Sequence, residues 1–170
     1  YRYGDESSWL LKDCSFALER GQWLSIIGES GVGKSTLVKI LTGLVRPVQG
    51  SIMANGQALD PEVRHSLRRH IGVVMQNDGL FGGSLRDNIT FYDVEPDIEQ
   101  MHNCAIVAGI HEQIQKMPMK YETPIGEQGA GLSAGQLQRI MLARALYRRP
   151  DVLILDEFTA NLDEAAEAAI

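Results

Sequence analysis

The feature that most constrains this chain is a glycine-rich segment between an apolar run and a helical pattern. Residues 28–36 read Gly-Glu-Ser-Gly-Val-Gly-Lys-Ser-Thr and fit the pattern G-x-x-x-x-G-K-[ST]. The apolar run at residues 23–27 predicts a short buried strand before it, and Leu37, Ile40, Leu41 and Leu44 have the spacing of one helix face after it. A strand that turns through glycines into a helix directs backbone N–H groups and a helix N-terminus at one point, which suits a polyphosphate.

The residue types within this segment predict how a nucleotide would be held. Gly31 and Gly33 let the backbone approach phosphate groups, Lys34 can reach the β and γ oxygens, and the Ser35 hydroxyl can ligate Mg²⁺. The alternative is a chance glycine-rich turn, which a random chain of this length would contain on the order of one time in a hundred. We therefore predict a nucleotide site formed by Gly28, Glu29, Ser30, Gly31, Val32, Gly33, Lys34, Ser35 and Thr36.

Composition narrows the class of protein. With 170 residues, 44% of them hydrophobic and 22% charged, the chain reads as one soluble globular domain with a core of its own. Twenty-two acidic residues against 16 basic ones give a net charge of −6, which does not favour a nucleic-acid partner. No apolar run approaches the ~20 residues that span a bilayer, and no signal peptide opens the sequence. Cys14, Cys104 and the four histidines lack metal-ligand spacing, so we expect reduced thiols in a cytosolic setting and structural or surface histidines.

Strand and helix patterns alternate along the chain. Antiparallel strands are predicted over residues 10–18, a hairpin over 50–57 with its turn at Asn55-Gly56, and buried parallel strands over 71–75 and 152–155. Helices are predicted to begin after Ser84, to lie within 96–109, and to run from 134 to 149 with Ser133 as the N-cap, whereas 123–132 is expected to be loop. The alternation predicts an α/β domain with a mainly parallel sheet. Because ligands bind at the carboxyl ends of such strands, Gly28, Gln76 and Asp156 are expected at one edge.

An acidic pair follows the last apolar run. Asp156 can hold Mg²⁺ through water, and Glu157 can polarise an attacking water as a general base. A solvated pair at a strand end is the alternative. The phosphate loop at the same end of the predicted sheet favours the catalytic interpretation.

The segment Leu132-Ser133-Ala134-Gly135-Gln136 resembles the L-S-G-G-Q signature of ABC ATPases. A capped helix N-terminus with small residues makes a second anion site. The resemblance implies that Ser133, Ala134, Gly135 and Gln136 close over the γ-phosphate held by another subunit. A plain capped helix is the alternative. Ala134 departs from the family's glycine, and we expect a weaker contact to ATP rather than its loss.

Further matches to ABC ATPases cover nearly the whole chain. Gln76 resembles the glutamine that contacts Mg²⁺ and senses the transmembrane partner, and Tyr3 resembles the aromatic that stacks on adenine, although Tyr3 read alone could be a strand tyrosine. Residues 161–163 resemble the loop that crosses the dimer interface, but Phe158 and Ala160 depart from the family just before it. The resemblance implies a RecA-like P-loop core over 1–77 and 146–170, with an N-terminal antiparallel β part, and an inserted helical subdomain over 78–145 that carries the signature.

Two segments resemble exporters within this family. They are residues 80–89 and residues 123–129, in which Glu127 matches a residue that contacts the transmembrane domain. The resemblance is to bacterial exporters of bacteriocins, peptides and toxins, and it implies an ATPase with ATP and Mg²⁺ as cofactors, Lys34, Gln76 and Glu157 as catalytic residues, and Ser35, Gln76 and Asp156 at the metal. It also implies a homodimer bound to a transmembrane domain at the cytoplasmic face of the inner membrane. The chain ends before the family's switch histidine, so an incomplete catalytic site or a longer parent protein is expected.

Two other functions are consistent with parts of the pattern. A soluble ABC ATPase that acts on nucleic acid or ribosomes would share the nucleotide motifs, but the acidic balance and the Glu127 segment count against it. A P-loop kinase would share residues 28–36, but would have no reason for residues 132–136.

Overall fold

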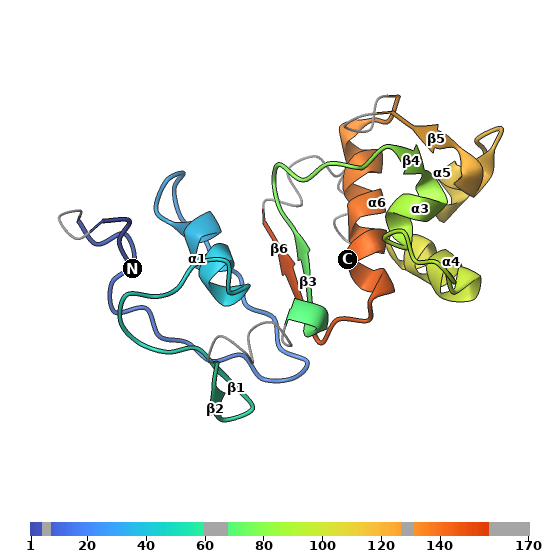
Figure 1. Ribbon diagram of the computed structural model, residues 1–170. Helices are drawn as coiled ribbons and strands as arrows, with labels where there is room; N and C mark the ends of the chain where they lie inside the picture. The colour runs from blue at the N-terminus through green and yellow to red at the C-terminus, as the bar shows by residue number, and fades with distance from the viewer. Residues whose placement is uncertain (5–7, 60–67, 127–130, 157–170) are drawn as a thin grey trace. The chain divides into compact units, whose positions relative to one another are not determined.

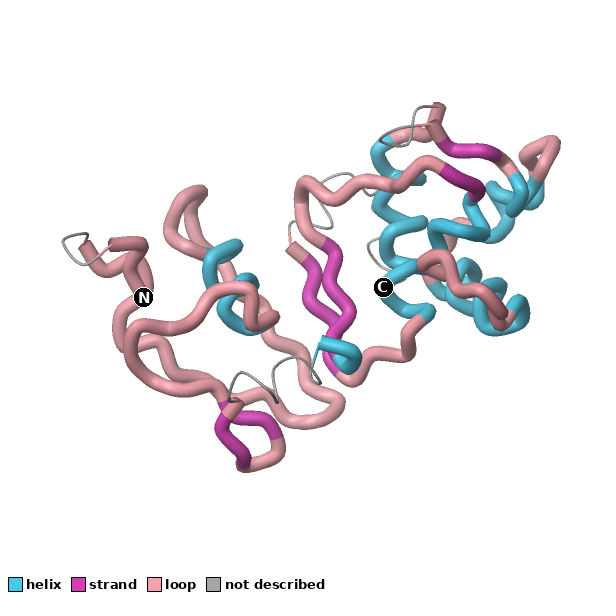
Figure 2. The backbone as a smooth tube through the Cα atoms, in the orientation of Figure 1, coloured by secondary structure: helices cyan, strands magenta, loops and turns pink. Residues whose placement is uncertain are grey.

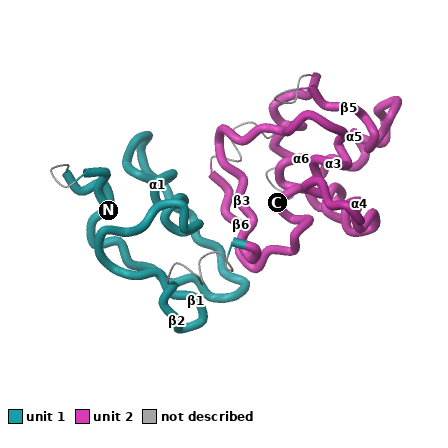
Figure 3. Tube along the Cα trace, viewed as in Figure 1, with its two compact units in different colours: residues 1–68 teal, residues 69–170 magenta. Residues whose placement is uncertain are grey.

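The computed structural model describes residues 1–4, 8–59, 68–126 and 131–156 of the chain. Two compact units are distinguished within it, residues 1–68 and residues 69–170 (Figure 3). The first unit holds the phosphate loop. The second unit holds Gln76, Asp156 and the segment that resembles the signature, residues 132–136. The predicted division at residues 77 and 146 stays a prediction.

Helix α1 (Lys34–Leu41) begins directly after the phosphate loop, as predicted. It ends where Gly43 takes a left-handed conformation with φ of 72°. Its buried residues are Thr36, Val38 and Ile40, whereas Leu44 is 64% exposed. The predicted apolar face was therefore partly wrong, because Leu44 lies beyond the last helical turn and does not continue that face.

A tight hairpin joins β1 (Met53–Ala54) to β2 (Gln57–Ala58), which pair antiparallel. Asn55 and Gly56 have φ of 49° and 77°. Positive φ at both central residues is the requirement of a type I′ turn, so the predicted hairpin is confirmed.

The strands predicted over residues 10–18 and 23–27 do not form in the described part of the first unit, where β1 and β2 are the only paired strands. Trp23 is 81% and Ile27 is 92% exposed, so the run is not buried there either. These predictions were wrong for this unit. An apolar run becomes a strand only where a neighbouring strand pairs with its backbone groups, and neither run has such a neighbour among the described residues of the unit.

Helix α6 (Ala134–Tyr147) is the central element of the second unit. It packs against α3 (Leu85–Ile89), α4 (Ile98–Val107) and β3 (Ile71–Val74) (Figure 1). Ile140 on α6 is fully buried, and the core around it includes Leu85, Ile89, Met101, Ile110 and Ile114. The helix ends two residues earlier than predicted, because Arg149 adopts a left-handed φ of 51° and Pro150 follows.

Strand β3 pairs in parallel with β6 (Val152–Leu155), with Ile71 opposite Val152 and Val74 opposite Leu155 (Figure 2). Both predicted strands are confirmed as parallel, and the structure shows in addition that they are neighbours. The expectation that residues 152–155 are buried was wrong for the second unit, where Val152 is 40% and Leu153 is 37% exposed. Because β6 has one strand neighbour among the described residues of this unit, its side chains are not enclosed as those of a central strand would be.

Gly72 lets β3 lie close to the end of α6. A methyl group at this position would meet Cγ of Pro150 at 2.9 Å and the carbonyl oxygen of Ala145 at 3.0 Å. Both distances are shorter than ordinary carbon contacts, so a side chain here would push the strand away from the helix.

The remaining elements of the second unit are short. They are η1 (Arg68–His70), which spans the boundary between the units, β4 (Gly83–Ser84), α5 (His111–Gln115), η2 (Lys120–Glu122) and β5 (Pro124–Ile125). Strands β4 and β5 pair antiparallel, so the segment predicted as loop after residue 122 includes two strand residues. Among the described residues, no helix has the length and apolar character to span a bilayer.

Candidate nucleotide site

The phosphate loop adopts a conformation that requires its glycines. Gly31 and Gly33 have φ of 85° and 105°, and Gly33 is the residue that caps α1. A side chain at Gly33 would also lie 3.1 Å from Cγ of Leu10. Backbone N–H groups at the start of α1 thus follow two glycine residues with left-handed φ. This is the arrangement that forms an anion-binding loop.

Lys34 closes this loop on itself. Its side-chain nitrogen donates to the carbonyl oxygens of Gly28 at 2.7 Å and Glu29 at 2.8 Å. The ammonium group therefore lies over the first residues of the loop, beside the N-terminus of the helix that it begins. A cation and a helix N-terminus at one place attract the same anionic ligand.

Tyr3 lies beside the first turn of α1. Its hydroxyl group is 2.8 Å from the hydroxyl of Thr36, which is buried, and its ring contacts Tyr1 edge to face at 5.1 Å. The side chain is nevertheless 66% exposed. The first unit therefore brings an exposed aromatic ring next to the phosphate loop, where the ring can stack on a base.

The second unit brings Gln76 and Asp156 to one end of the parallel strand pair. Asp156 follows β6 directly, donates its backbone N–H to the carbonyl oxygen of Val74 at 2.9 Å, and is 8% exposed. Gln76 follows β3 after one intervening residue. Both residues thus lie at the carboxyl ends of their strands, as predicted. That Gly28 joins them at the same edge stays a prediction, because Gly28 belongs to the other unit.

The oxygen donors at these positions suit Mg²⁺. The ion prefers carboxylate and hydroxyl oxygens and keeps several of its waters. Asp156, a buried residue, supplies a carboxylate at a strand end of the second unit, and Ser35 supplies a hydroxyl in the first turn of α1 in the first unit. That the two residues meet at one ion stays a prediction. Within the described residues no cluster of three or more His, Cys, Asp or Glu side chains competes for a metal, and Cys14 and Cys104 are both free.

The predicted N-cap of α6 is confirmed with its full capping box. The hydroxyl of Ser133 accepts from the backbone N–H of Gln136 at 3.2 Å, and Oε1 of Gln136 accepts from the backbone N–H of Ser133 at 2.9 Å. Ser133 and Ala134 are exposed, so the helix N-terminus faces solvent. An exposed, capped N-terminus of a 14-residue helix is suited to an anion, as the resemblance implies.

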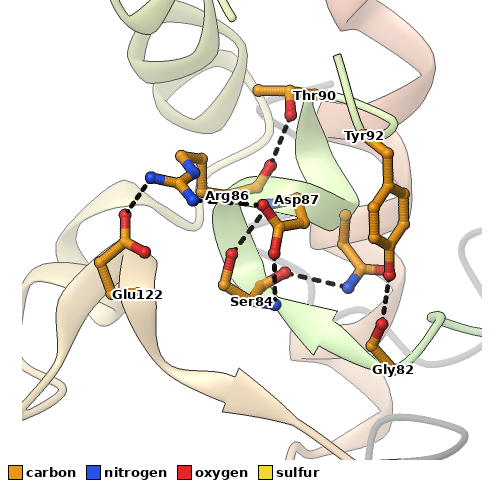
Figure 4. Close-up of polar contacts among 8 residues, drawn as sticks. Gly82, Ser84, Arg86, Asp87, Thr90, Tyr92 and Glu122 are labelled. Atoms are coloured by element: carbon orange, nitrogen blue, oxygen red, sulfur yellow. Dashed lines mark hydrogen bonds and ion pairs between the residues drawn. The ribbon is translucent and has the colours of Figure 1, made fainter. Parts of the chain in front are cut away.

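A network of polar contacts holds residues 82–92, which follow Gln76 in the chain (Figure 4). Ser84 caps α3 with a capping box formed with Asp87, Arg86 pairs with Glu122 at 2.9 Å, and Tyr92 donates to the carbonyl of Gly82. Hydrogen bonds to the backbone N–H and hydroxyl of Ser84 lower the pKa of Asp87. The segment is thus fixed to α3 and to the residues just before β5.

The sequence analysis did not identify two residues, Asn88 and Arg144, that hold the chain around this segment. The Asn88 amide, which is fully buried, accepts from the N–H of Phe81 and donates to the carbonyls of Phe81 and Ser84. Arg144 on α6 donates to the carbonyl of Gly79 at 3.1 Å, and burial lowers the pKa of its guanidinium, an effect that Asp78 opposes. A polar residue among Leu85 and Ile89 on the buried face of a short helix was the signal that could have identified Asn88.

Several predicted residues lie outside the described part of the chain. These are Glu157, Glu127 and residues 158–163, so their predicted roles stay predictions.

The chain is similar to proteins of one family. The family model that describes the ABC transporter matches residues 11–160. The probable microcin-H47 secretion/processing ATP-binding protein MchF of Escherichia coli is 46% identical over 167 residues, which is 98% of this chain and 24% of that protein. The exotoxin translocation ATP-binding protein PaxB of Pasteurella aerogenes is 42% identical over 170 residues, covering 100% of this chain and 24% of that protein.

A solved structure is similar in fold as well as sequence. The ATP-bound structure of a bacterial Atm1-family ABC exporter matches 84% of this chain and 25% of its own chain, with 34% identity and a TM-score of 0.78. The predicted α/β fold of P-loop nucleotide hydrolases is thereby confirmed. The chain spans about a quarter of the length of the curated relatives it matches.

Proposed function

This chain belongs to the ABC transporter family, and on that premise we propose that it is the ATP-binding and ATP-hydrolysing domain of a bacterial exporter. The observation that carries the proposal is the phosphate loop. Two left-handed glycines, the N-terminus of α1 and the Lys34 ammonium converge within the first unit, which is the arrangement that binds a triphosphate.

The residues divide the work of hydrolysis. Lys34 and the backbone N–H groups of residues 31–36 bind and orient the β- and γ-phosphates, and the Tyr3 ring stacks on adenine. Ser35, Gln76 and Asp156 would hold Mg²⁺, which neutralises charge on the phosphate oxygens. Glu157 follows Asp156 directly and would orient the attacking water and accept its proton.

A second copy of the domain would complete each site. The exposed N-terminus of α6, with Ser133, Ala134 and Gly135 in its first turn, presents backbone N–H groups to the γ-phosphate held by the partner. ATP would therefore sit between the phosphate loop of one copy and the signature of the other, and binding would drive dimerisation.

The exporter assignment rests on the kind of relatives that this chain matches. They are named for the secretion of microcins and the translocation of exotoxins, so we infer that the cargo is a peptide, bacteriocin or protein toxin. The domain would act at the cytoplasmic face of the inner membrane, and the segments around Gln76 and Glu127 would contact the transmembrane domain. A soluble ABC ATPase acting on nucleic acid or ribosomes is less consistent with the net charge of −6.

Glu157→Gln in the full-length protein provides the test. Without the carboxylate, bound ATP persists, so we expect a stable ATP-dependent dimer of these domains and loss of ATPase activity. Mass photometry or size-exclusion chromatography with Mg·ATP measures the first, and phosphate release measures the second. Undiminished ATPase activity in this variant would contradict the role of Glu157.

A further inference from the structure

The side-chain amide of Gln136 is held at both of its ends. Its Oε1 accepts from the backbone N–H of Ser133 at 2.9 Å, and its Nε2 donates to Oε1 of Gln113 at 3.1 Å. Rotating the amide by half a turn would set its NH₂ group against the N–H of Ser133 and its oxygen against the oxygen of Gln113. The acceptor on Gln113 therefore selects the one amide orientation that also closes the capping box.

Gln113 is itself fixed by the helix that carries it. Helix α5 has five residues, too few for an isolated helix to be stable in water. Ile110 and Ile114 on either side of Gln113 are both fully buried, and His111 bonds to the Tyr121 hydroxyl at 2.8 Å. The core thus sets the position of α5, and with it the backbone position of Gln113 beside the first turn of α6.

A second contact links the same two regions. The guanidinium of Arg139, one turn further along α6, donates to the carbonyl oxygen of Gly109 at 3.4 Å. Gly109 has a left-handed φ of 67° and ends the turn that leads into α5. The first two turns of α6 are therefore attached to the segment from residue 109 to residue 113.

We propose that Gln113 is a positioning residue for ATP binding: it orients the Gln136 amide, and through it the N-terminal turn of α6 that meets the γ-phosphate of the partner copy. The proposal rests on the proposed function. When the acceptor is lost, only the backbone N–H of Ser133 still holds the Gln136 amide. The capping box then opens in a larger part of the population, and fewer molecules have the turn ready for phosphate.

Three variants of the full-length protein test this role. Gln113→Met removes the acceptor and keeps a side chain of similar length. Gln113→Glu keeps an acceptor oxygen but adds a negative charge near the phosphate site. Gln115→Met is the matched control, because Gln115 lies on the same helix and makes no hydrogen bond to α6 within the part of the chain that the structure describes. Steady-state hydrolysis of Mg·ATP gives KM and kcat, and a thermal melt reports stability.

Gln113→Met loses one hydrogen bond, so we expect its KM to rise roughly threefold to tenfold at both low and high salt. Gln113→Glu should raise KM at low salt and return towards wild type at high salt, because its charge is screened while its acceptor remains. Gln115→Met should leave KM unchanged. An unchanged KM in Gln113→Met, with or without a lower melting temperature, would overturn the proposal.

The premise is checked separately in the same assay. ATPase activity of the wild-type protein that is lost in Lys34→Ala establishes the proposed function independently of Gln113. If the wild type has no such activity, the proposed function fails. If it has the activity and Gln113→Met matches the control variant, only the role of Gln113 fails.

Discussion

The side-chain nitrogen of Lys34 lies 2.7 Å from the carbonyl oxygen of Gly28, so the cation that would bind phosphate also joins the end of the loop to its beginning. The same nitrogen is 2.8 Å from the carbonyl oxygen of Glu29. Both carbonyls accept hydrogen bonds from the ammonium group, which in the proposed complex with ATP would also donate to phosphate oxygens.

Replacing Lys34 by alanine should abolish tight ATP binding. The variant loses charge-assisted hydrogen bonds that contribute about 1.5–3 kcal/mol, so affinity should fall about tenfold or more. Equilibrium titration with a fluorescent ATP analogue measures this. Lys39→Ala is the control, because Lys39 lies in the last turn of the same helix. Equal affinities in the two variants would refute the phosphate-loop assignment.

The hydrogen bond between Tyr3 and Thr36 allows the ring and the hydroxyl of Tyr3 to be tested apart. Tyr3→Ala removes the surface for base stacking, which is worth ~1–3 kcal/mol, and should weaken ATP binding accordingly. Tyr3→Phe keeps the ring and loses only the contact to Thr36, so its affinity should stay closer to that of the wild type. Calorimetric titration with ATP distinguishes the two, and an unaltered affinity in Tyr3→Ala would return Tyr3 to a structural role.

Gly72→Ala should destabilise the protein through a steric clash. The added methyl group would meet Pro150 at 2.9 Å and the carbonyl of Ala145 at 3.0 Å, and such overpacking costs about 1–3 kcal/mol. Chemical denaturation of the two proteins compares their free energies of unfolding. Gly79→Ala serves as the control, since a methyl group there has no neighbour within 4 Å in the described part of the chain. Equal losses of unfolding free energy in the two variants would show that the contact between β3 and α6 has room for the added methyl group.

The carboxylate of Asp87 should contribute to the acid sensitivity of the second unit. Hydrogen bonds from Ser84 lower its pKa in the folded protein below the ordinary value, so the folded state binds fewer protons than the unfolded state. The resulting stability is present above about pH 4 and is lost as the pH falls through the lowered pKa.

Asp87→Asn should therefore reduce the loss of unfolding free energy between pH 6 and pH 3, as measured by denaturant titration at each pH. A wild-type acid response in Asp87→Asn would show that the capping box does not stabilise the charged form.

Local chemistry explains the elements that sequence reasoning located correctly. Ser133 and Gln136 form their capping box from residues three positions apart, and Asn55-Gly56 turns the hairpin because both residues accept positive φ. The phosphate loop is of the same kind, since Gly31 and Gly33 have left-handed φ, which glycine adopts without steric cost. Such signals lie within a few residues of the structure that they predict.

The sequence by itself determined the phosphate loop, the caps at Ser84 and Ser133, the two parallel strands and the family, because each depends on neighbouring residues or on a pattern spread along the whole chain. Tertiary structure alone decided that β6 is half exposed, that residues 23–27 pair with no strand in the described part of the first unit, and that Gln113 meets Gln136. Gln113 and Gln136 are 23 positions apart in the sequence. Their contact exists because the buried Ile110 and Ile114, at the start of α5 and within it, and the packed face of α6 bring the two amides together, and no local pattern contains that information.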